Sequence, residues 1–259
     1  MNLNERHKGV VLIGQPGIGK SIFLYYILVR RVLGSQVTIF EDRPDKKYIF
    51  GESFEAVTQL NPQDYPKAWA LSDSNTNLVH PSASFTSASS KFFTLQATSP
   101  QPERWYRWMK YRSTVLVAMD LWSWDEIYIG ATKFESQKIN IEVLKHVFIN
   151  YSRSARDCYE LADDFETIDQ LKSSRGVQCL EHSIKKFIRN SPDTDILQGI
   201  TSGGMYADLN EKDIICQSSQ VIAIRPCKDK DHHPFITITT KYISDCVSRG
   251  LMDKNAQKF

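Results

Sequence analysis

A glycine-rich segment near the N-terminus constrains this chain more than any other feature of its sequence. Residues 14–21 read Gly-Gln-Pro-Gly-Ile-Gly-Lys-Ser, which is the spacing G-x-x-x-x-G-K-[ST]. The segment follows an apolar run at Val10–Ile13 and precedes apolar residues at helical spacing up to about Leu33. These patterns predict a buried parallel strand before the segment and a helix after it. Strand, glycine loop and helix stand in the order that a phosphate-binding loop requires.

The residue types in this loop suit a nucleoside triphosphate. Glycines reach positive φ, so the backbone N–H groups around Gly14, Gly17 and Gly19 can form an anion site at a helix N-terminus. Lys20 is placed to reach the β- and γ-phosphates, and the Ser21 hydroxyl to bind Mg²⁺. The predicted nucleotide-binding residues are Gly14, Gln15, Pro16, Gly17, Ile18, Gly19, Lys20, Ser21 and Ile22.

A magnesium site also needs a carboxylate at the end of a neighbouring strand. Asp73 ends the strand predicted from Ala68 and is the first candidate, together with Ser21, as a metal-binding residue. Asp120 follows another apolar run at 115–119 and is the alternative. A plain aspartate at a strand end is the competing interpretation of Asp73.

Three more polar residues are candidates for contact with the phosphates. Thr98 and Ser99 follow the strand predicted at 91–97, where a hydroxyl can sense the γ-phosphate, although a turn before Pro100 explains them equally well. Arg156 lies at the start of a predicted helix, from which it would bring a cation to the phosphates. An exposed arginine at a helix start is the alternative.

The pattern as a whole predicts an α/β fold with a P-loop NTPase core of about five mainly parallel strands. We expect this core at 1–120, a helical lid at 121–175 and a small C-terminal α+β region at 176–259. Within these, the sequence predicts a surface loop at 75–91 with room for one helical turn, a helix at 103–111, a capping box at Ser123 and Glu126, a hairpin of two strands at 220–224 and 235–239, and a helix from Lys241.

Composition and charge exclude several classes of protein. The net charge of +2 gives no field that would indicate nucleic acid, and no apolar stretch approaches the roughly 20 residues of a membrane span. The polar start of the chain, Met1–Gly9, leaves no room for a signal peptide. We therefore expect an intracellular protein, in cytoplasm or nucleus, without a nucleic-acid or membrane partner.

Two groups of residues have plain structural interpretations. Trp105 and Trp108 alternate with basic residues, which favours an amphipathic helix packed on the sheet over a nucleic-acid surface. Asp229, Asp231, His232 and His233 resemble metal ligands in type but fall in a predicted hairpin turn without further ligands.

The chain also resembles a known family. Residues 15–26, Gln-Pro-Gly-Ile-Gly-Lys-Ser-Ile-Phe-Leu-Tyr-Tyr, are similar to the P-loop of the Crinkler and retrotransposon-hot-spot type NTPases. Four further segments recur in the order of that family: Trp-Ala-Leu-Ser-Asp-Ser at 69–74, Thr-Ser-Pro at 98–100, Leu-Trp-Ser-Trp-Asp-Glu at 121–126 and Ser-Ala-Arg-Asp-Cys-Tyr at 154–159. The resemblance covers roughly residues 10–159.

This resemblance implies an AAA-like signalling ATPase that uses ATP and Mg²⁺, with Lys20, Asp73 and Arg156 as its catalytic residues. We expect slow or regulated Mg²⁺-dependent hydrolysis that serves as a nucleotide-dependent switch toward a protein partner or a second copy. A non-hydrolysing interaction module is the alternative. A small-molecule kinase is disfavoured because no arginine-rich lid with an acceptor pocket is recognisable.

The residues after Asp73 bear on the rate of hydrolysis. Ser74 and Asn75 stand where many fast P-loop ATPases have an acidic residue, and neither accepts a proton well near neutral pH. Unless a carboxylate arrives from elsewhere, general-base assistance worth about 10²–10⁴-fold is missing. Glu126 is one source, but its capping-box position favours a structural role. We therefore expect turnover well below about 10 s⁻¹.

The motif predicts that Lys20→Ala weakens ATP binding by about 10- to 100-fold, since a charge-assisted hydrogen bond contributes about 1.5–3 kcal/mol. Isothermal titration calorimetry measures the change, with Lys67→Ala, outside the motif, as the control. Equal affinities of Lys20→Ala and the unaltered chain would contradict the assignment of the loop.

Overall fold

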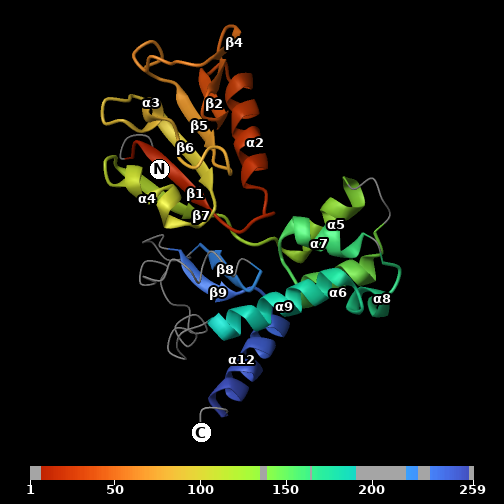
Figure 1. Cartoon of the computed structure of the whole chain (residues 1–259). Coiled ribbons are helices and arrows are strands. Elements are labelled where there is room, and N and C mark those ends of the chain that lie inside the picture. The colour runs from red at the N-terminus through yellow and green to blue at the C-terminus, as the bar shows by residue number, and fades with distance from the viewer. Residues whose placement is uncertain (1–6, 135–138, 164, 191–219, 227–233, 257–259) are drawn as a thin grey trace. The chain divides into compact units, whose positions relative to one another are not determined.

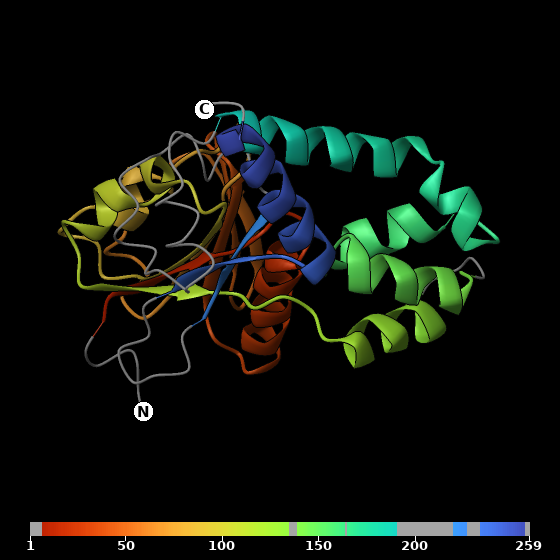
Figure 2. The ribbon, with the colours of Figure 1, turned by 90° about the horizontal axis from the view of Figure 1, so that it is seen from below.

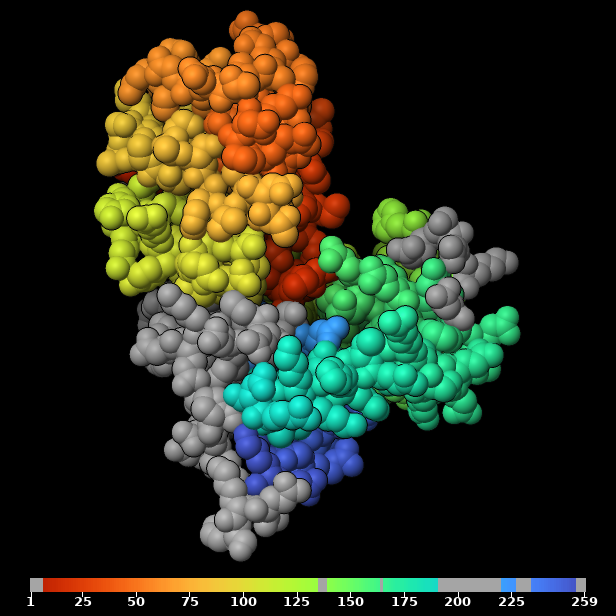
Figure 3. Space-filling view, viewed as in Figure 1, coloured from red at the N-terminus to blue at the C-terminus, as the bar shows by residue number. Residues whose placement is uncertain are grey.

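The chain divides into two compact units. The computed structural model describes residues 7–134, 139–163, 165–190, 220–226 and 234–256, and the remaining residues are grey in Figure 3. One unit comprises the residues up to Gly14 together with Gly19–Met119. The other comprises Gln15–Ile18 and the residues from Asp120 onward. The predicted division of the latter into a lid and a C-terminal region stays a prediction.

The first unit is built on a seven-stranded, mostly parallel sheet with the order β4-β3-β2-β5-β6-β1-β7. The strands are β1 (Gly9–Ile13), β2 (Thr38–Arg43), β3 (Lys46–Phe50), β4 (Phe54–Val57), β5 (Trp69–Asp73), β6 (Phe93–Thr98) and β7 (Thr114–Ala118). Strands β2, β5, β6, β1 and β7 pair in parallel, while β3 and β4 add an antiparallel edge next to β2. The α/β class and the mainly parallel sheet are confirmed. The sequence does not predict β4, because most of its residues are exposed and show no apolar alternation.

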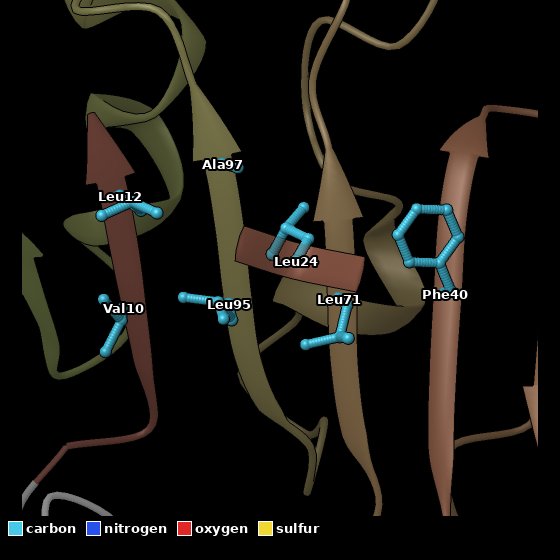
Figure 4. Close-up of a cluster of buried hydrophobic side chains, with 7 residues drawn as sticks. All are labelled: Val10, Leu12, Leu24, Phe40, Leu71, Leu95 and Ala97. Atoms are coloured by element: carbon cyan, nitrogen blue, oxygen red, sulfur yellow. The ribbon is translucent and has the colours of Figure 1, made fainter. Parts of the chain in front are cut away.

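Alternating residues of the central strands build two cores, one on each face of the sheet. On one face Leu24, from α2 (Lys20–Leu33), lies over Val10, Leu12, Phe40, Leu71, Leu95 and Ala97, as Figure 4 shows. On the other face Ile39, Ile49 and Ala70 pack with Phe85 and Phe92. In Figure 1, α2 accordingly lies on one side of the sheet, and α3 (Ala83–Thr86) and α4 (Tyr106–Met109) lie on the other.

The segment 75–91 is a loop with one helical turn, α3, as predicted, but it does not lie wholly on the surface. Phe85 of α3 is fully buried and meets Phe92 edge to face. The buried guanidinium of Arg112 donates to the carbonyl oxygens of Phe85, Ser90 and Phe92. The many Ser, Thr and Asn residues of the segment 75–91 make the packing hard to predict from the sequence. In the structure, their hydroxyl and amide groups bond to the local backbone.

The helix predicted at 103–111 is interrupted. A 3₁₀ turn, η1 (Pro102–Arg104), is followed by the short α4, with Trp105 between them at φ −140°. Both Trp105 and Trp108 are buried, so the packing interpretation of this segment is confirmed. Trp108 Nε1 donates to Gln96 Oε1 of β6 at 2.7 Å.

The second unit is helical over its first part and ends in a hairpin and a helix. Its elements are α5 (Trp124–Lys133), α6 (Ile141–Asn150), α7 (Ala155–Ala162), α8 (Ile168–Lys172), α9 (Arg175–Asn190), β8 (Ile222–Arg225), β9 (Phe235–Ile238) and α12 (Lys241–Ala256). The capping box of Ser123 and Glu126, the antiparallel hairpin and the last helix are confirmed. Helix α12 packs on α9, as the ribbon in Figure 2 shows. Lys254 Nζ of α12 donates to Ile188 O of α9 at 3.2 Å. The predicted turn residues 229–233 lie outside the described ranges.

No helix within the described ranges combines the length and the apolar character needed to cross a membrane.

The packing of the 75–91 segment predicts that Phe85→Ala lowers the free energy of unfolding by about 3–5 kcal/mol, because it leaves a cavity in the core that Phe85 shares with Phe92 and the aliphatic residues of the sheet. Chemical denaturation of the nucleotide-free protein measures this loss. Val79→Ala, in the same segment but 38% exposed, is the matched control and should change the free energy by no more than about 0.5 kcal/mol. Similar small values for both variants would contradict the packed arrangement.

Candidate functional site

The loop between β1 and α2 takes the conformation that its glycines allow. Gly17 has φ 79° and Gly19 φ 96°, both in the left-handed region, and Gly19 caps α2. A Cβ atom at Gly17 would also lie 2.7 Å from both Ser154 Oγ and Arg156 Cβ. Gly17 is therefore required both by its backbone conformation and by the space around it.

The structure brings Ser21 and Asp73 together. Ser21 Oγ, in the first turn of α2, donates to Asp73 Oδ1, at the end of β5, at 3.1 Å. Lys20 Nζ donates to the carbonyl oxygen of Gly14 at 2.9 Å, across its own loop. The two predicted metal-binding residues are thus neighbours, although 52 positions separate them in the sequence.

The carboxyl group of Asp73 lies in an environment that disfavours its charge. Burial raises its pKa, the hydrogen bond from Ser21 and the charge of Lys20 lower it, and the negative charge of Asp42 raises it; the net shift is upward. A cation bound at this carboxylate would offset the cost of burying the charge. The residues present therefore fit a Mg²⁺ ion, which in nucleotide sites uses one or two protein oxygens besides phosphate and water.

Asp120, the alternative to Asp73, has a different partner. Arg225 Nε donates to Asp120 Oδ1 at 2.7 Å, and Arg225 Nη2 to Asp120 Oδ2 at 3.2 Å. Both carboxylate oxygens thus belong to an ion pair between the start of the second unit and its hairpin. This favours Asp73 over Asp120 as the magnesium-binding residue.

Two hydroxyl groups at the end of β6 stand out by their burial. Thr98 Oγ1 and Ser99 Oγ are buried, and neither has a hydrogen-bond partner within the described ranges. Thr98 pairs in register with Ile13, the last residue of β1, so it lies beside the start of the glycine loop. Buried hydroxyls normally find a partner, which makes these two groups available to a ligand or a water molecule.

The residues that follow Asp73 serve to fix strand ends. Ser74 Oγ accepts from Gln96 Nε2 at 2.8 Å. Asn75 Nδ2 donates to the carbonyl oxygens of Asp42, at 2.7 Å, and of Asp73, at 3.2 Å. Asp42 is not among the residues predicted from the sequence, because its position next to Asp73 depends on the pairing of β2 with β5 and leaves no local signal.

Within the second unit, the middle of the glycine loop is bonded to three distant segments. Gly17 O accepts from the backbone N–H of Arg156 at 3.4 Å, and Ile18 O from Trp122 Nε1 at 2.9 Å. Gln15 Nε2 donates to the carbonyl oxygen of Ile222. The side chain of Arg156, in the first turn of α7, is exposed, and so are those of Pro16 and Ile22.

Glu126 is bound within its own helix terminus. The backbone N–H and the hydroxyl of Ser123 donate to Glu126 Oε2 at 2.7 and 2.8 Å. The structural role expected of Glu126 as part of a capping box is therefore confirmed.

Comparison of the chain with protein-family models and with curated proteins finds no match. Any functional assignment therefore rests on the site described above.

The environment of Asp73 predicts opposite effects of Asp73→Asn on stability and on ligand binding. The pKa of Asp73 is raised in the folded state, so its protonated carboxyl group adds to the free energy of unfolding at low pH. This stabilisation is lost as the pH rises through the folded pKa. At neutral pH the substitution should therefore raise the Tm of the nucleotide-free protein, and below about pH 3.9 this gain should vanish. Loss of the carboxylate should weaken Mg²⁺-ATP binding by about 10- to 100-fold.

Differential scanning calorimetry and a binding titration measure the two effects. Asp45→Asn, an exposed aspartate in the nearby β2–β3 turn, is the control and should change neither. A lower Tm for Asp73→Asn at neutral pH would contradict the assigned electrostatics.

Proposed function

We propose that this chain is an ATP-binding P-loop protein with slow or regulated Mg²⁺-dependent ATP hydrolysis, and that it works as a nucleotide-dependent switch. The observation that carries the proposal is the hydrogen bond between Ser21 and Asp73 at the start of the glycine loop's helix. A hydroxyl and a carboxylate in this arrangement are the two protein ligands that Mg²⁺ needs beside a triphosphate.

The topology of the sheet supports the proposal. Ligands of open α/β sheets bind at the carboxyl ends of the strands, where the order of the strands changes direction. β1 leads through α2 to β2, while β7 returns to the other side of β1, so the change of direction falls at β1. The glycine loop, Asp73 and the buried hydroxyl of Thr98 all lie at the carboxyl ends of β1, β5 and β6.

Each residue of the site has a distinct role in the proposal. The N–H groups of the loop and the N-terminus of α2 would bind the phosphate oxygens, and Lys20 would exchange the carbonyl of Gly14 for the β- and γ-phosphates. Ser21 and Asp73 would hold Mg²⁺, which when bound neutralises charge on those phosphates. Thr98 and Ser99 would donate to the γ-phosphate or to a water molecule near it.

Hydrogen bonds within the second unit support the proposed role as a nucleotide-dependent switch. Residues Gln15–Ile18 belong to that unit through their hydrogen bonds with Trp122, Arg156 and Ile222. A triphosphate bound to the N–H groups of these loop residues would therefore act directly on backbone that is bonded to α7. Arg156 would contribute its exposed guanidinium as the lid arginine that the resemblance to the Crinkler-type NTPases implies.

A non-hydrolysing nucleotide-binding module is the second candidate. It is favoured by the engagement of Ser74 and Asn75, whose side chains hold neighbouring strands and so offer no general base. In either form, we propose an intracellular protein that acts on a protein partner or on a second copy of itself.

The proposal predicts saturable binding of ATP that weakens when EDTA removes Mg²⁺, measured by calorimetric titration. ATP at 100 times its Kd should raise the free energy of unfolding by about 2.7 kcal/mol. GTP and ADP titrations give the specificity, and a phosphate-release assay separates slow hydrolysis from mere binding. Absence of binding by every nucleotide tested would refute the proposal, and binding without phosphate release would select the second candidate.

A further inference from the structure

A second carboxyl group lies beside the magnesium aspartate. Strands β2 and β5 run parallel with Glu41 paired to Ser72, so the next residues along these two strands are Asp42 and Asp73. The Asn75 amide holds the two strand ends together, because it donates to the carbonyl oxygens of both aspartates. Neighbouring strands lie about 4.8 Å apart, which places the two residues side by side at the carboxyl edge of the sheet.

Both side chains lie on the face of the sheet that α2 covers. Phe40 and Leu71 belong to the core on that face, and the ring of Phe40 stacks on Tyr25 of α2 with centroids 5.4 Å apart. On β5 the side chain returns to the same face two residues beyond Leu71, at Asp73, where it accepts from Ser21 of α2. The pairing of β2 with β3 is irregular between Phe40 and Arg43, so Asp42 is placed near this face by its electrostatic contact with Tyr25 of α2 and not by alternation. Consistent with this, after the larger effect of burial the charge of Asp42 raises the pKa of Tyr25, and it also contributes to the raised pKa of Asp73.

The neighbouring Glu41 does not share this position. It is fully buried and accepts hydrogen bonds from the backbone N–H of Ser82, at 2.9 Å, and from the Ser82 hydroxyl. Its alternation with Phe40 and its contact with the segment before α3 place it on the opposite face. Asp42, in contrast, is about one-third exposed and pairs with Arg43 Nε at 3.2 Å. Exposed pairs of this kind contribute little, so a water molecule can compete for the carboxylate.

We propose that Asp42 is the general base of ATP hydrolysis in this chain, acting on a water molecule beside the site formed by Lys20, Ser21 and Asp73. The inference rests on the proposed function. Asp42, on β2, would supply the carboxylate that Ser74 and Asn75, which follow β5, lack.

Hydrolysis of ATP forms one bond to the γ-phosphorus and breaks another. The water oxygen forms a bond to the γ-phosphorus while the bond between that phosphorus and the β,γ-bridging oxygen breaks. The electron pair of the broken bond stays on the bridging oxygen of ADP, and the Asp42 carboxylate takes the proton that the water releases. The products are ADP and inorganic phosphate, and no oxidant or reductant takes part.

A general base at Asp42 changes the expected rate of ATP hydrolysis. The sequence predicts slow turnover because it predicts no carboxylate near Asp73, and Asp42 is such a carboxylate. Hydrolysis is then limited by how often Asp42 leaves Arg43 and meets the water molecule, which favours a regulated ATPase over a non-hydrolysing module.

The test compares Asp42→Asn with the unaltered chain and with Asp45→Asn, a matched change three residues away in the exposed turn. Mg²⁺-ATP affinity is measured by calorimetry and single-turnover hydrolysis by phosphate release. We expect Asp42→Asn to keep or increase the affinity, since it removes a negative charge near the phosphates, and to lower the hydrolysis rate by about 10²–10⁴-fold. Asp42→Glu, which keeps a carboxylate, should recover part of the rate, and Asp45→Asn should match the unaltered chain.

The outcomes separate this inference from the proposed function. A hydrolysis rate of Asp42→Asn within a few fold of the unaltered rate overturns the inference and leaves the proposed function standing. Binding of ATP by the unaltered chain without any hydrolysis also overturns it and selects the non-hydrolysing module. Failure of the unaltered chain to bind ATP removes both. A loss of affinity in Asp42→Asn equal to its loss of rate would show that Asp42 acts in binding, which also overturns its role as a base.

Discussion

The parallel register of β2, β5, β6 and β1 is the constraint on which the candidate site depends. It pairs Ile13 with Thr98 and Asp73 with Ala97, so the strands end at nearly the same level. Residues that are tens of positions apart in the sequence therefore meet at the carboxyl edge of the sheet. This alignment comes mainly from backbone hydrogen bonds, is supported by apolar layers on both faces, and is reinforced at the edge by Ser74 and Asn75. Asp73 and Thr98 are not needed to hold the strands together, so they remain available for a ligand.

Much of this arrangement could be predicted from local sequence. The apolar run at Val10–Ile13, the glycine spacing and the helical periodicity after Lys20 are each encoded within a few residues, as is the capping box at Ser123. Asp73 could be found because a strand end is also a local feature. The pairing of Asp73 with Ser21 then follows once strand and helix are assigned, since parallel strands present their carboxyl ends together.

The features that escaped prediction depend on contacts between distant segments. Phe85 lies among serines and threonines that favour a loop, and its burial follows from its packing with Phe92 against the sheet and from the carbonyl contacts of Arg112. Asp42 is one of several acidic residues near a turn, and only the pairing of β2 with β5 distinguishes it.

The close approach at Gly17 has a mechanical consequence. Its carbonyl is bonded to the N–H of Arg156, and the space beside its Cα is too small for a methyl group. The loop and the first turn of α7 therefore touch at Gly17, where one hydrogen bond joins the two backbones and no side chain fits. Any residue larger than glycine would have to push the two segments apart, so the absence of a Cβ at position 17 sets how closely loop and helix approach.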